Sequence, residues 1–357
     1  MAVYLFLLFV PIFIQHIRLG DNFAEYRKRN ASALTMFFLF LTVLIMLRHE
    51  TVGKDTANYI SFFGKFARME WGSIADYGLE PGFSYFNKII TLFTSNPQIY
   101  LALSALAVSA MIFPTYRRLC TDASLTIVLF CIMSTFQMMF SGIRQMLAVG
   151  IGFIAYELTR NKKLISFILC VLLAMTFHTS AFMLAFMYPL YHAKITKKWL
   201  LAVVPSLVVI FLLNRQIFGF LGTFIERYTK YDTAIQQTGA YTMLLLFAVF
   251  AVFAFLIPDE SKLDSETIGL RNFLLLALVM QMFAPLHNLA MRMNYYYIIF
   301  IPLLLPKIIQ YRSTRWTQVA VLGRHVMLVF FCAYFFLSIS GGGSLHIVPY
   351  HFFWESV

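Results

Sequence analysis

Residues 164–191 have the sequence LISFILCVLLAMTFHTSAFMLAFMYPLY and contain no Asp, Glu, Lys or Arg. Lys162 and Lys163 precede this stretch, and Lys194 follows it. FHTSA (177–181) divides it into two short apolar arms of about 10 to 14 residues, or ~15–21 Å as helices. In hydrocarbon every backbone amide must be satisfied within the segment, so such runs are predicted to be helices. The stretch therefore predicts a helical hairpin in a bilayer, with a polar turn below the membrane surface.

The rest of the chain follows the same pattern. Of its 357 residues, 60% are hydrophobic and 12% are charged, whereas a soluble domain carries roughly 25% charged residues. The predicted fold is an all-α polytopic membrane protein with about 12 transmembrane helices. It is expected to be a single transmembrane helical domain over residues 1–357, with outer loops at 48–96 and 214–239. The predicted spans are 3–17, 31–47, 97–115, 125–140, 146–158, 164–177, 181–191, 199–213, 241–257, 272–283, 295–306 and 319–337.

One further apolar segment, 82–93, is predicted to be a re-entrant or interfacial helix. Counting it as a full span would place the basic turn 159–163 on the outside. With 82–93 re-entrant, most of the 28 Lys and Arg residues face the inside, as the distribution of cations in membrane proteins requires. Both termini are then predicted to lie outside, and the N-terminus is predicted to be a retained first span.

Several classes of protein are disfavoured by the sequence. The four cysteines are scattered, without metal-ligand, redox or disulfide spacing. No internal repeat or matched pair of broken helices points to a secondary transporter, and ionisable residues are nearly absent from the span centres. Most of the net charge of +12 is attributed to the inner side, and no nucleic-acid partner is expected. Because polar residues gather at the outer ends of spans, we expect a chamber that opens outward.

Four outer stretches are candidates for this chamber, and each has a structural alternative. The first, running from 47–59 to 80–83, could be only a solvated loop with an interfacial anchor. The arginine of 141–145 could only extend to lipid headgroups, and the histidine of 177–181 could be a satisfied core residue. The tyrosines of 287–297 could form an interfacial belt. The long outer loop 214–239 adds Arg227, either as part of a lid or in a solvated crossing.

Several arginines with few nearby acids suit a polyphosphate, because the guanidinium fork makes bidentate bonds to phosphate oxygens. A phosphate held at a membrane surface suggests one linked to a lipid, and the aromatic and mixed polar groups nearby suit an attached carbohydrate. The candidate ligands for the diphosphate and the sugar are Arg48, Arg144, Gln145, Arg227, Arg292 and Tyr295. The candidates for a base that accepts a proton from a sugar hydroxyl are His178, Glu80 and Asp55. No metal ion or other cofactor is expected.

RHETVGKDTANY (48–59), EPGF (80–83), SGIRQMLAVG (141–150), FHTSA (177–181) and an arginine before a tyrosine-rich span resemble the EpsG family in order and spacing. The resemblance covers roughly residues 41–305. The family comprises Wzy-like bacterial polymerases of exopolysaccharide and O-antigen. The family's pattern is matched at Arg48, Gly53, Asp55, Glu80, Gly82, Arg144, Gln145, His178 and Arg292.

This resemblance implies a multi-pass glycosyltransferase of the GT-C fold class in the bacterial plasma membrane, with its active site on the periplasmic or extracellular side. It implies that oligosaccharide repeat units on undecaprenyl diphosphate are joined, with release of undecaprenyl diphosphate. It also implies a chain-length-determinant protein as a partner. The alternatives are a lipid-linked oligosaccharide flippase, an O-antigen ligase and a sugar O-acyltransferase. A flippase would need a lumen open alternately to both sides and, usually, two related halves.

Overall fold

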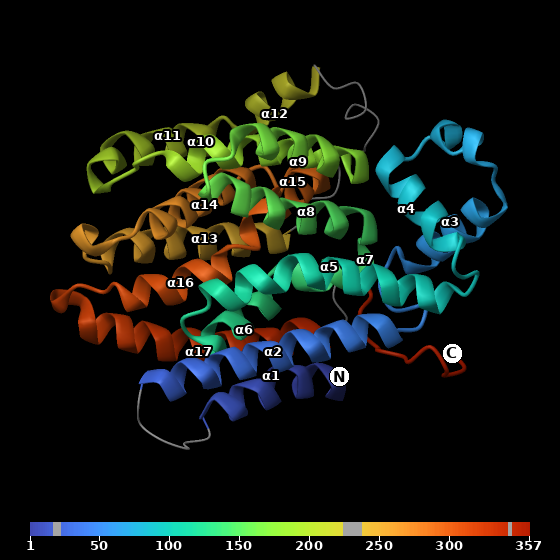
Figure 1. Ribbon diagram of the computed structural model, residues 1–357. Helices are drawn as coiled ribbons and strands as arrows, with labels where there is room; N and C mark the ends of the chain where they lie inside the picture. Colours follow the sequence, from blue (N-terminus) through green and yellow to red (C-terminus); the bar gives the residue numbers. More distant parts are fainter. Residues whose placement is uncertain (17–22, 224–237, 342–344) are drawn as a thin grey trace. The chain divides into compact units, whose positions relative to one another are not determined.

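In the computed structural model, every regular element of the described residues is a helix (Figure 1). The structure describes residues 1–16, 23–223, 238–341 and 345–357. They form two compact units, of which the first comprises Met1–Ala185 with Leu322–Val357 and the second comprises Phe186–Val321. An all-helical chain is what the sequence predicts, and each unit is described separately below.

The first unit is built from the N-terminal helices and most of the last helix. Its core is formed by the pairs α1–α2, α2–α5, α5–α8 and α8–α9, each of which packs side by side. The elements are α1 (Ala2–His16), α2 (Phe23–Leu47), α3 (Thr56–Arg68), α4 (Pro81–Thr91), α5 (Pro97–Leu119), α6 (Ala123–Ile132), α7 (Ser134–Ser141), α8 (Ile143–Arg160), α9 (Leu164–Phe177), the 3₁₀ helix η3 (Thr179–Phe186) and α17 (Thr317–Ser340).

In the second unit α14 is the central helix, packed against α10, α13, α15 and α16. Its buried face carries Arg271 and Asn272, which are both fully buried. The helices are α10 (Met187–His192), α11 (Leu200–Leu212), α12 (Asn214–Thr223), α13 (Thr238–Leu256), α14 (Ser265–Gln281), α15 (Asn288–Ile298) and α16 (Ile301–Gln310).

The number of predicted spans is not confirmed. By length and composition, three helical segments of the described residues are suited to cross a bilayer: Tyr26–Leu47, Pro97–Leu119 and Thr314–Ser340. Three bent pairs raise this number to six if each pair is one span: Ala123–Ile132 with Ser134–Ser141, Thr179–His192 with Lys197–Leu212, and Leu289–Ile298 with Ile301–Gln310. The predicted runs 125–140 and 295–306 are thus broken by bends of 65° and 40°. In the second of these, Pro302 lies in the first turn of α16, where its missing amide proton interrupts the helical hydrogen bonds.

The segment 82–93 is not a full span. It forms α4, which has 11 residues and is therefore only about 16 Å long. One face of α4 buries Phe83, Asn87 and Ile90, while Ile89 and Leu92 on the other face are exposed. A short helix with one apolar exposed face suits a position in the membrane interface, and the re-entrant or interfacial placement of 82–93 stays a prediction.

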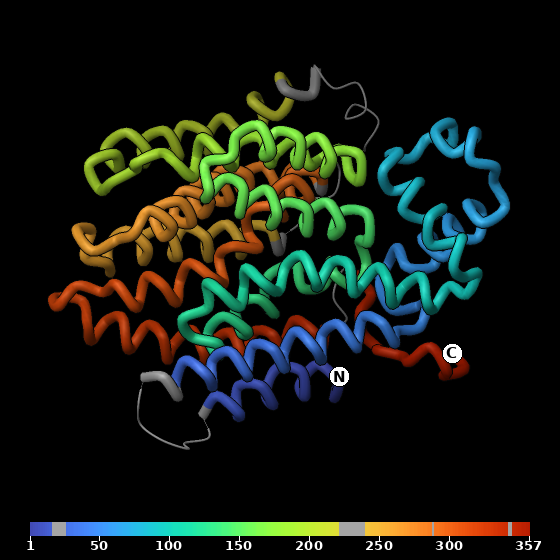
Figure 2. Tube along the Cα trace, viewed as in Figure 1, coloured from blue at the N-terminus to red at the C-terminus, as the bar shows by residue number. Residues whose placement is uncertain are grey.

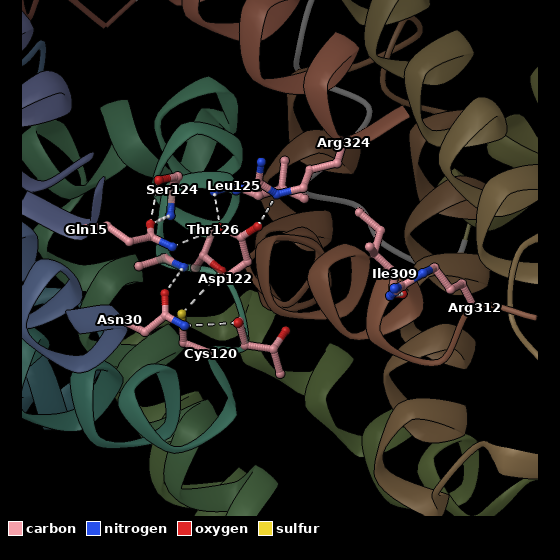
Figure 3. Close-up of polar contacts among 12 residues, drawn as sticks. Gln15, Asn30, Cys120, Asp122, Ser124, Leu125, Thr126, Ile309, Arg312 and Arg324 are labelled. Carbon is pink, nitrogen blue, oxygen red and sulfur yellow. Dashed lines mark hydrogen bonds and ion pairs between the residues drawn. The ribbon is translucent and has the colours of Figure 1, made fainter. Parts of the chain in front are cut away.

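A polar cluster joins four helices at one end of the first unit (Figure 3). Asp122 caps α6 by accepting the amide of Leu125, and its other oxygen pairs with Arg324 of α17. Gln15 of α1 donates to Asp122 at 3.4 Å, and Asn30 of α2 donates to the carbonyl of Thr121 at 3.1 Å. Because Asp122 and Arg324 are largely buried, removing either partner would leave an unpaired buried charge. The cluster therefore fixes the ends of α1, α2, α6 and α17.

The opposite end of the first unit is closed by the C-terminal segment. It lies along the loop after α2, with His49 N bonded to His351 O at 2.8 Å and Gly53 N to His346 O at 2.8 Å. The hydroxyl of Tyr4 in α1 donates to Ile347 O at 2.6 Å. The two chain ends thus meet at the same end of this unit (Figure 1), in agreement with the prediction that both lie on one side of the membrane.

In the second unit, too, a set of polar contacts lies together among the loops at one end. Arg271 pairs with Glu260 at 2.7 Å and donates to Ile195 O at 2.7 Å, and Lys307 pairs with Glu266 at 3.1 Å. The loops 193–199, 257–265 and 311–316, all predicted to be inner, are linked by these contacts and by an isolated bridge between Pro258 and Arg312.

Candidate functional site

The EPGF sequence builds the entrance to α4. Glu80 is the residue before the helix, and Pro81 occupies its first turn, where a missing amide proton costs nothing. Gly82 packs directly on α9, since a Cβ atom there would come within 2.2 Å of Thr176 Oγ1 and 2.9 Å of the Thr176 carbonyl oxygen. Only glycine allows so close an approach. This contact places Glu80 beside the end of α9.

Arg144 lies in the first turn of α8, directly after the break at Gly142. Its Nη1 donates to Glu80 Oε2 at 2.6 Å, and the two side chains are 23% and 16% exposed. The guanidinium carbon lies 5.9 Å from the centre of the Phe83 ring, within the range of a cation–π contact. In the described part of the chain Nε of Arg144 is buried and makes no hydrogen bond. Arg144 is therefore a charged group paired with Glu80, and its Nε remains as a donor without a hydrogen bond in the described residues.

The FHTSA turn supplies the second contact to Glu80. Both the amide and the hydroxyl of Thr179 donate to Glu80 Oε1 at 3.2 Å. His178 Nδ1 lies 2.6 Å from Ser180 Oγ and accepts the Ser180 amide at 3.3 Å. An amide can only donate, so Nδ1 carries a lone pair, and we infer that the neutral ring has its proton on Nε2.

The loop after α2 is held against the turn between α7 and α8. Gly53 has φ of +93°, and a Cβ atom there would lie 2.3 Å from the Phe140 carbonyl oxygen. The amide of Asp55 donates to Ser141 Oγ at 3.2 Å. The Asp55 carboxylate precedes α3 without capping it, and it makes no hydrogen bond to any residue that the structure describes. Asp55 is thus positioned through its backbone while its carboxylate remains available.

Tyr59 of α3 connects Asp55 and Arg144. Burial raises the pKa of its hydroxyl, the charge of Asp55 adds to that rise, and the charge and hydrogen bonding of Arg144 oppose it. Its ring meets Phe83 edge-on, with the ring centres 5.7 Å apart. Asp55, Tyr59, Glu80, Arg144 and the FHTSA turn therefore form one cluster, which we call the Arg144 cluster.

The charge state of Glu80 differs from what the sequence suggests for a base. Burial by itself raises the pKa of this carboxyl group, but Arg144, the Glu80 and Thr179 amides and His178 outweigh it. The net pKa lies below the usual value, and both carboxylate oxygens already accept hydrogen bonds. Glu80 is consequently an ionised partner of Arg144 at neutral pH.

Arg48 is not open to a ligand in this structure. Its side chain is 1% exposed, and Nη1 donates to Ile45 O at 2.6 Å. A cation that binds a carbonyl at the end of α2 stabilises the helix C-terminus. The contact of Arg48 with a diphosphate therefore stays a prediction, and in this structure the side chain is buried. Tyr100, Tyr350 and Phe352 lie near it, which the sequence does not show.

The remaining predicted ligands are placed as follows. Gln145 is 1% exposed, so it packs inside the first unit rather than facing a chamber. Arg292 and Tyr295 lie on α15 in the second unit, where Arg292 is exposed and Tyr295 is 6% exposed. Tyr295 therefore presents little surface to a sugar. Arg227 lies outside the described residues.

Three contributors to the Arg144 cluster were missed by the sequence reasoning. Single hydroxyl groups carry no distinctive sequence pattern, so the sequence does not single out Thr179 and Ser141, although both lie inside the quoted motifs. Tyr59 closes the RHETVGKDTANY motif, and its position in the first turn of α3, four residues after the N-cap Asp55, could have indicated it. In the described residues, no group of three or more His, Cys, Asp or Glu side chains could hold a metal ion.

Comparison with known proteins adds one match. The sequence pattern that defines the EpsG family matches residues 33–352, which extends beyond the motifs quoted above at both ends. No curated protein and no solved structure is found to be similar to the chain.

Proposed function

The chain belongs to the EpsG family of Wzy-like polymerases, and we propose that it joins oligosaccharide repeat units carried on undecaprenyl diphosphate. The reaction would take place at the outer face of a bacterial plasma membrane, in a GT-C-like helical bundle. The growing chain would move from its carrier to the nonreducing end of the incoming unit. The observation that carries this proposal is the Arg144 cluster, in which four of the motifs quoted from the sequence meet around one guanidinium group.

In this reaction an acceptor hydroxyl attacks C1 of the donor sugar, and the bond from C1 to the diphosphate oxygen breaks. Negative charge builds on the diphosphate as it leaves. Arg144, with a buried and unbonded Nε in the described structure, would donate to its oxygens. A preorganised donor of this kind stabilises a transition state far more than the same group in water.

The attacking hydroxyl must lose a proton. Of the three predicted bases, Glu80 has both oxygens bonded, and His178 uses Nδ1 within its own turn. Asp55 is the carboxylate without a hydrogen bond in the described residues. We therefore assign the proton to Asp55, with Glu80 as the group that orients Arg144 and His178 as an Nε2–H donor.

The test uses the purified full-length chain with an undecaprenyl-diphosphate-linked repeat unit. Expected products are a ladder of polymer lengths and free undecaprenyl diphosphate. Arg144→Lys keeps the charge but loses the fork, so kcat should fall about a hundredfold. Arg68→Lys, at the exposed C-terminal end of α3, is the matched control and should retain full turnover.

Normal polymerisation by Arg144→Lys at equal abundance would rule out diphosphate recognition by this fork. The activity itself is decided by a deletion strain. Loss of a polymerase leaves single-repeat caps on the cell surface, loss of a ligase leaves none, and loss of a flippase leaves units inside the cell. Any result other than single-repeat caps would contradict the proposed reaction.

A further inference from the structure

A basic cavity lies at the other end of the first unit from the Arg144 cluster. Its volume is about 520 Å³ and it opens between the start of α2 and the end of α5, which run antiparallel side by side (Figure 2). The lining residues are Arg27, Lys28, Asn30, Ala31, Arg117, Arg118 and Cys120.

The lining has more positive than negative charge. Arg118 pairs with Glu157 at 2.8 Å, and Glu157 also binds Arg160 at 3.1 Å. Arg27, Lys28 and Arg117 line the cavity with no ion pair to any residue of the described ranges. The nearby Asp122 is taken by Arg324. Several cations facing one space create a site for a phosphate group.

An exposed stripe on each helix leads to this cavity. On α5 it is apolar as far as Arg117, whereas on α2 Thr35 and Ser32 separate the apolar residues from Lys28. Leu39 and Val43 of α2 and Leu103 and Leu106 of α5 are 59%, 38%, 38% and 46% exposed. Residues three or four positions apart lie on the same face of a helix. On each helix the exposed face therefore continues to a cation of the cavity, through residues 43, 39, 35, 32 and 28 of α2 and 99, 103, 106, 110, 114 and 117 of α5.

The cavity is separate from the Arg144 cluster. It lies at the N-terminal end of α2, whereas the loop that carries Asp55 follows the C-terminal end. Those ends are 25 residues apart, or about 37 Å. A ligand here would not touch the groups assigned to polymerisation.

We propose that this cavity binds the phosphate headgroup of an anionic phospholipid whose acyl chains lie along the exposed stripes of α2 and α5. The four cations recognise the phosphate, as basic pockets between membrane helices do. The apolar residues of these stripes favour a lipid over a soluble anion, because a free phosphate would gain nothing from them. The site is on the side of the chain predicted to be cytoplasmic.

The test is lipid binding to the full-length protein in detergent, measured by native mass spectrometry. The probes are dioleoylphosphatidylglycerol, dioleoylphosphatidylcholine and inorganic pyrophosphate. Phosphatidylglycerol should bind at least tenfold more tightly than phosphatidylcholine. The double variant Arg27→Gln/Arg117→Gln should bind it about 25-fold more weakly, at roughly fivefold for each lost cation. Lys162→Gln/Lys163→Gln, which removes two exposed cations outside the cavity lining, should keep its affinity.

A second variant keeps the proposal testable if the double variant does not fold. Glu157→Gln releases Arg118 from its ion pair and should strengthen phosphatidylglycerol binding several-fold, an effect that a purely structural Glu157 would not produce. Equal binding of the two phospholipids would overturn the proposal. Unchanged phosphatidylglycerol binding in both variants would do the same, and displacement of the lipid by equimolar pyrophosphate would assign the cavity to a soluble phosphate instead.

Discussion

Among single residues, Glu80 and Asp55 differ in whether their carboxylate oxygens already accept hydrogen bonds from described residues. One carboxylate oxygen of Glu80 accepts a hydrogen bond from Arg144, and the other accepts hydrogen bonds from Thr179. The pKa of this carboxyl group is held below the usual value. Because this pKa is lowered, the ion pair between Glu80 and Arg144 stabilises the fold at pH values above the pKa of the unfolded state. This stabilisation is lost only as the pH falls through the pKa of the folded state. At neutral pH Glu80 is therefore ionised and paired with Arg144.

This assignment predicts the order of effects in three substitutions. Asp55→Asn removes the proposed base and should lower kcat by about a hundredfold or more while KM changes little. His178→Gln should be milder, because it removes one donor from the site. Glu80→Gln should raise KM as well as lower kcat, since Arg144 then loses the group that orients it. Steady-state kinetics on the purified chain with a lipid-linked repeat unit measure all three.

A hundredfold loss in His178→Gln with nearly normal turnover in Asp55→Asn would return the base to His178. Near-normal turnover in all three variants would mean that no base is needed and that Arg144 alone drives departure of the diphosphate. Asp76→Asn is the control, because Asp76 is an exposed carboxylate in a 3₁₀ turn of the same loop.

The sequence identified Asp55, Glu80, Arg144 and His178 as candidates, and the structure brings these four together. It could not identify their roles. A role depends on which atoms are already bonded, and Thr179, Ser180 and Ser141 make those bonds through backbone and hydroxyl groups that no sequence pattern marks. Arg48 shows the same limit, since its neighbours include Tyr350 and Phe352 of the C-terminal segment, some 300 residues away in the chain.

At the scale of elements, the Arg144 cluster depends on close contact between loops and helices. The loop after α2 reaches the α7–α8 turn through Gly53, and α4 reaches α9 through Gly82. Both glycines stand in the motifs that resemble the EpsG family, so their presence there has a packing explanation.

Gly53→Ala is predicted to be strongly destabilising. An alanine at φ of +93° costs about 1–2 kcal/mol in backbone strain alone, and its Cβ would also collide with the Phe140 carbonyl. The collision should push Asp55 from Ser141, so turnover should fall with stability. Gly64→Ala is the matched control in α3, where a Cβ meets nothing within 4 Å and alanine favours the helix by up to ~1 kcal/mol. Thermal unfolding in detergent measures the midpoint temperatures of the two variants. Equal midpoint temperatures would contradict the predicted strain at position 53.

Element lengths explain why the number of predicted spans was not confirmed. Hydropathy locates apolar runs but does not show where a helix bends, and the runs 125–140 and 295–306 are each two helices. The 11-residue helix at 82–93 is too short to cross hydrocarbon about 30 Å thick, and its interfacial position stays a prediction.

At the scale of the molecule, charge is sorted by end within each unit. In the first unit the basic cavity and the Asp122 cluster occupy one end, while Glu80, Arg144 and both chain termini occupy the other. In the second unit Arg271, Lys197 and Lys307 lie among loops predicted to be inner. This sorting agrees with the partition read from the sequence, although the direction across the membrane comes only from the distribution of cations.

That direction can be tested in each unit separately by labelling single cysteines, in a background without the four native ones, with a reagent that does not cross the membrane. For the first unit, Gly72→Cys in the outer loop should be labelled from outside, whereas Lys162→Cys should be labelled only after the membrane is opened. For the second unit, Gln216→Cys should behave like Gly72→Cys, and Lys198→Cys like Lys162→Cys. All four positions are exposed, so an unlabelled cysteine reports its side and not its burial. Reversal of both pairs would invert the chain and place the Arg144 cluster on the inner face, where outward polymerisation could not occur. Reversal of one pair alone would show that the cations of that unit do not set its orientation. The proposed inner position of the phospholipid site depends on the result for Gly72→Cys and Lys162→Cys.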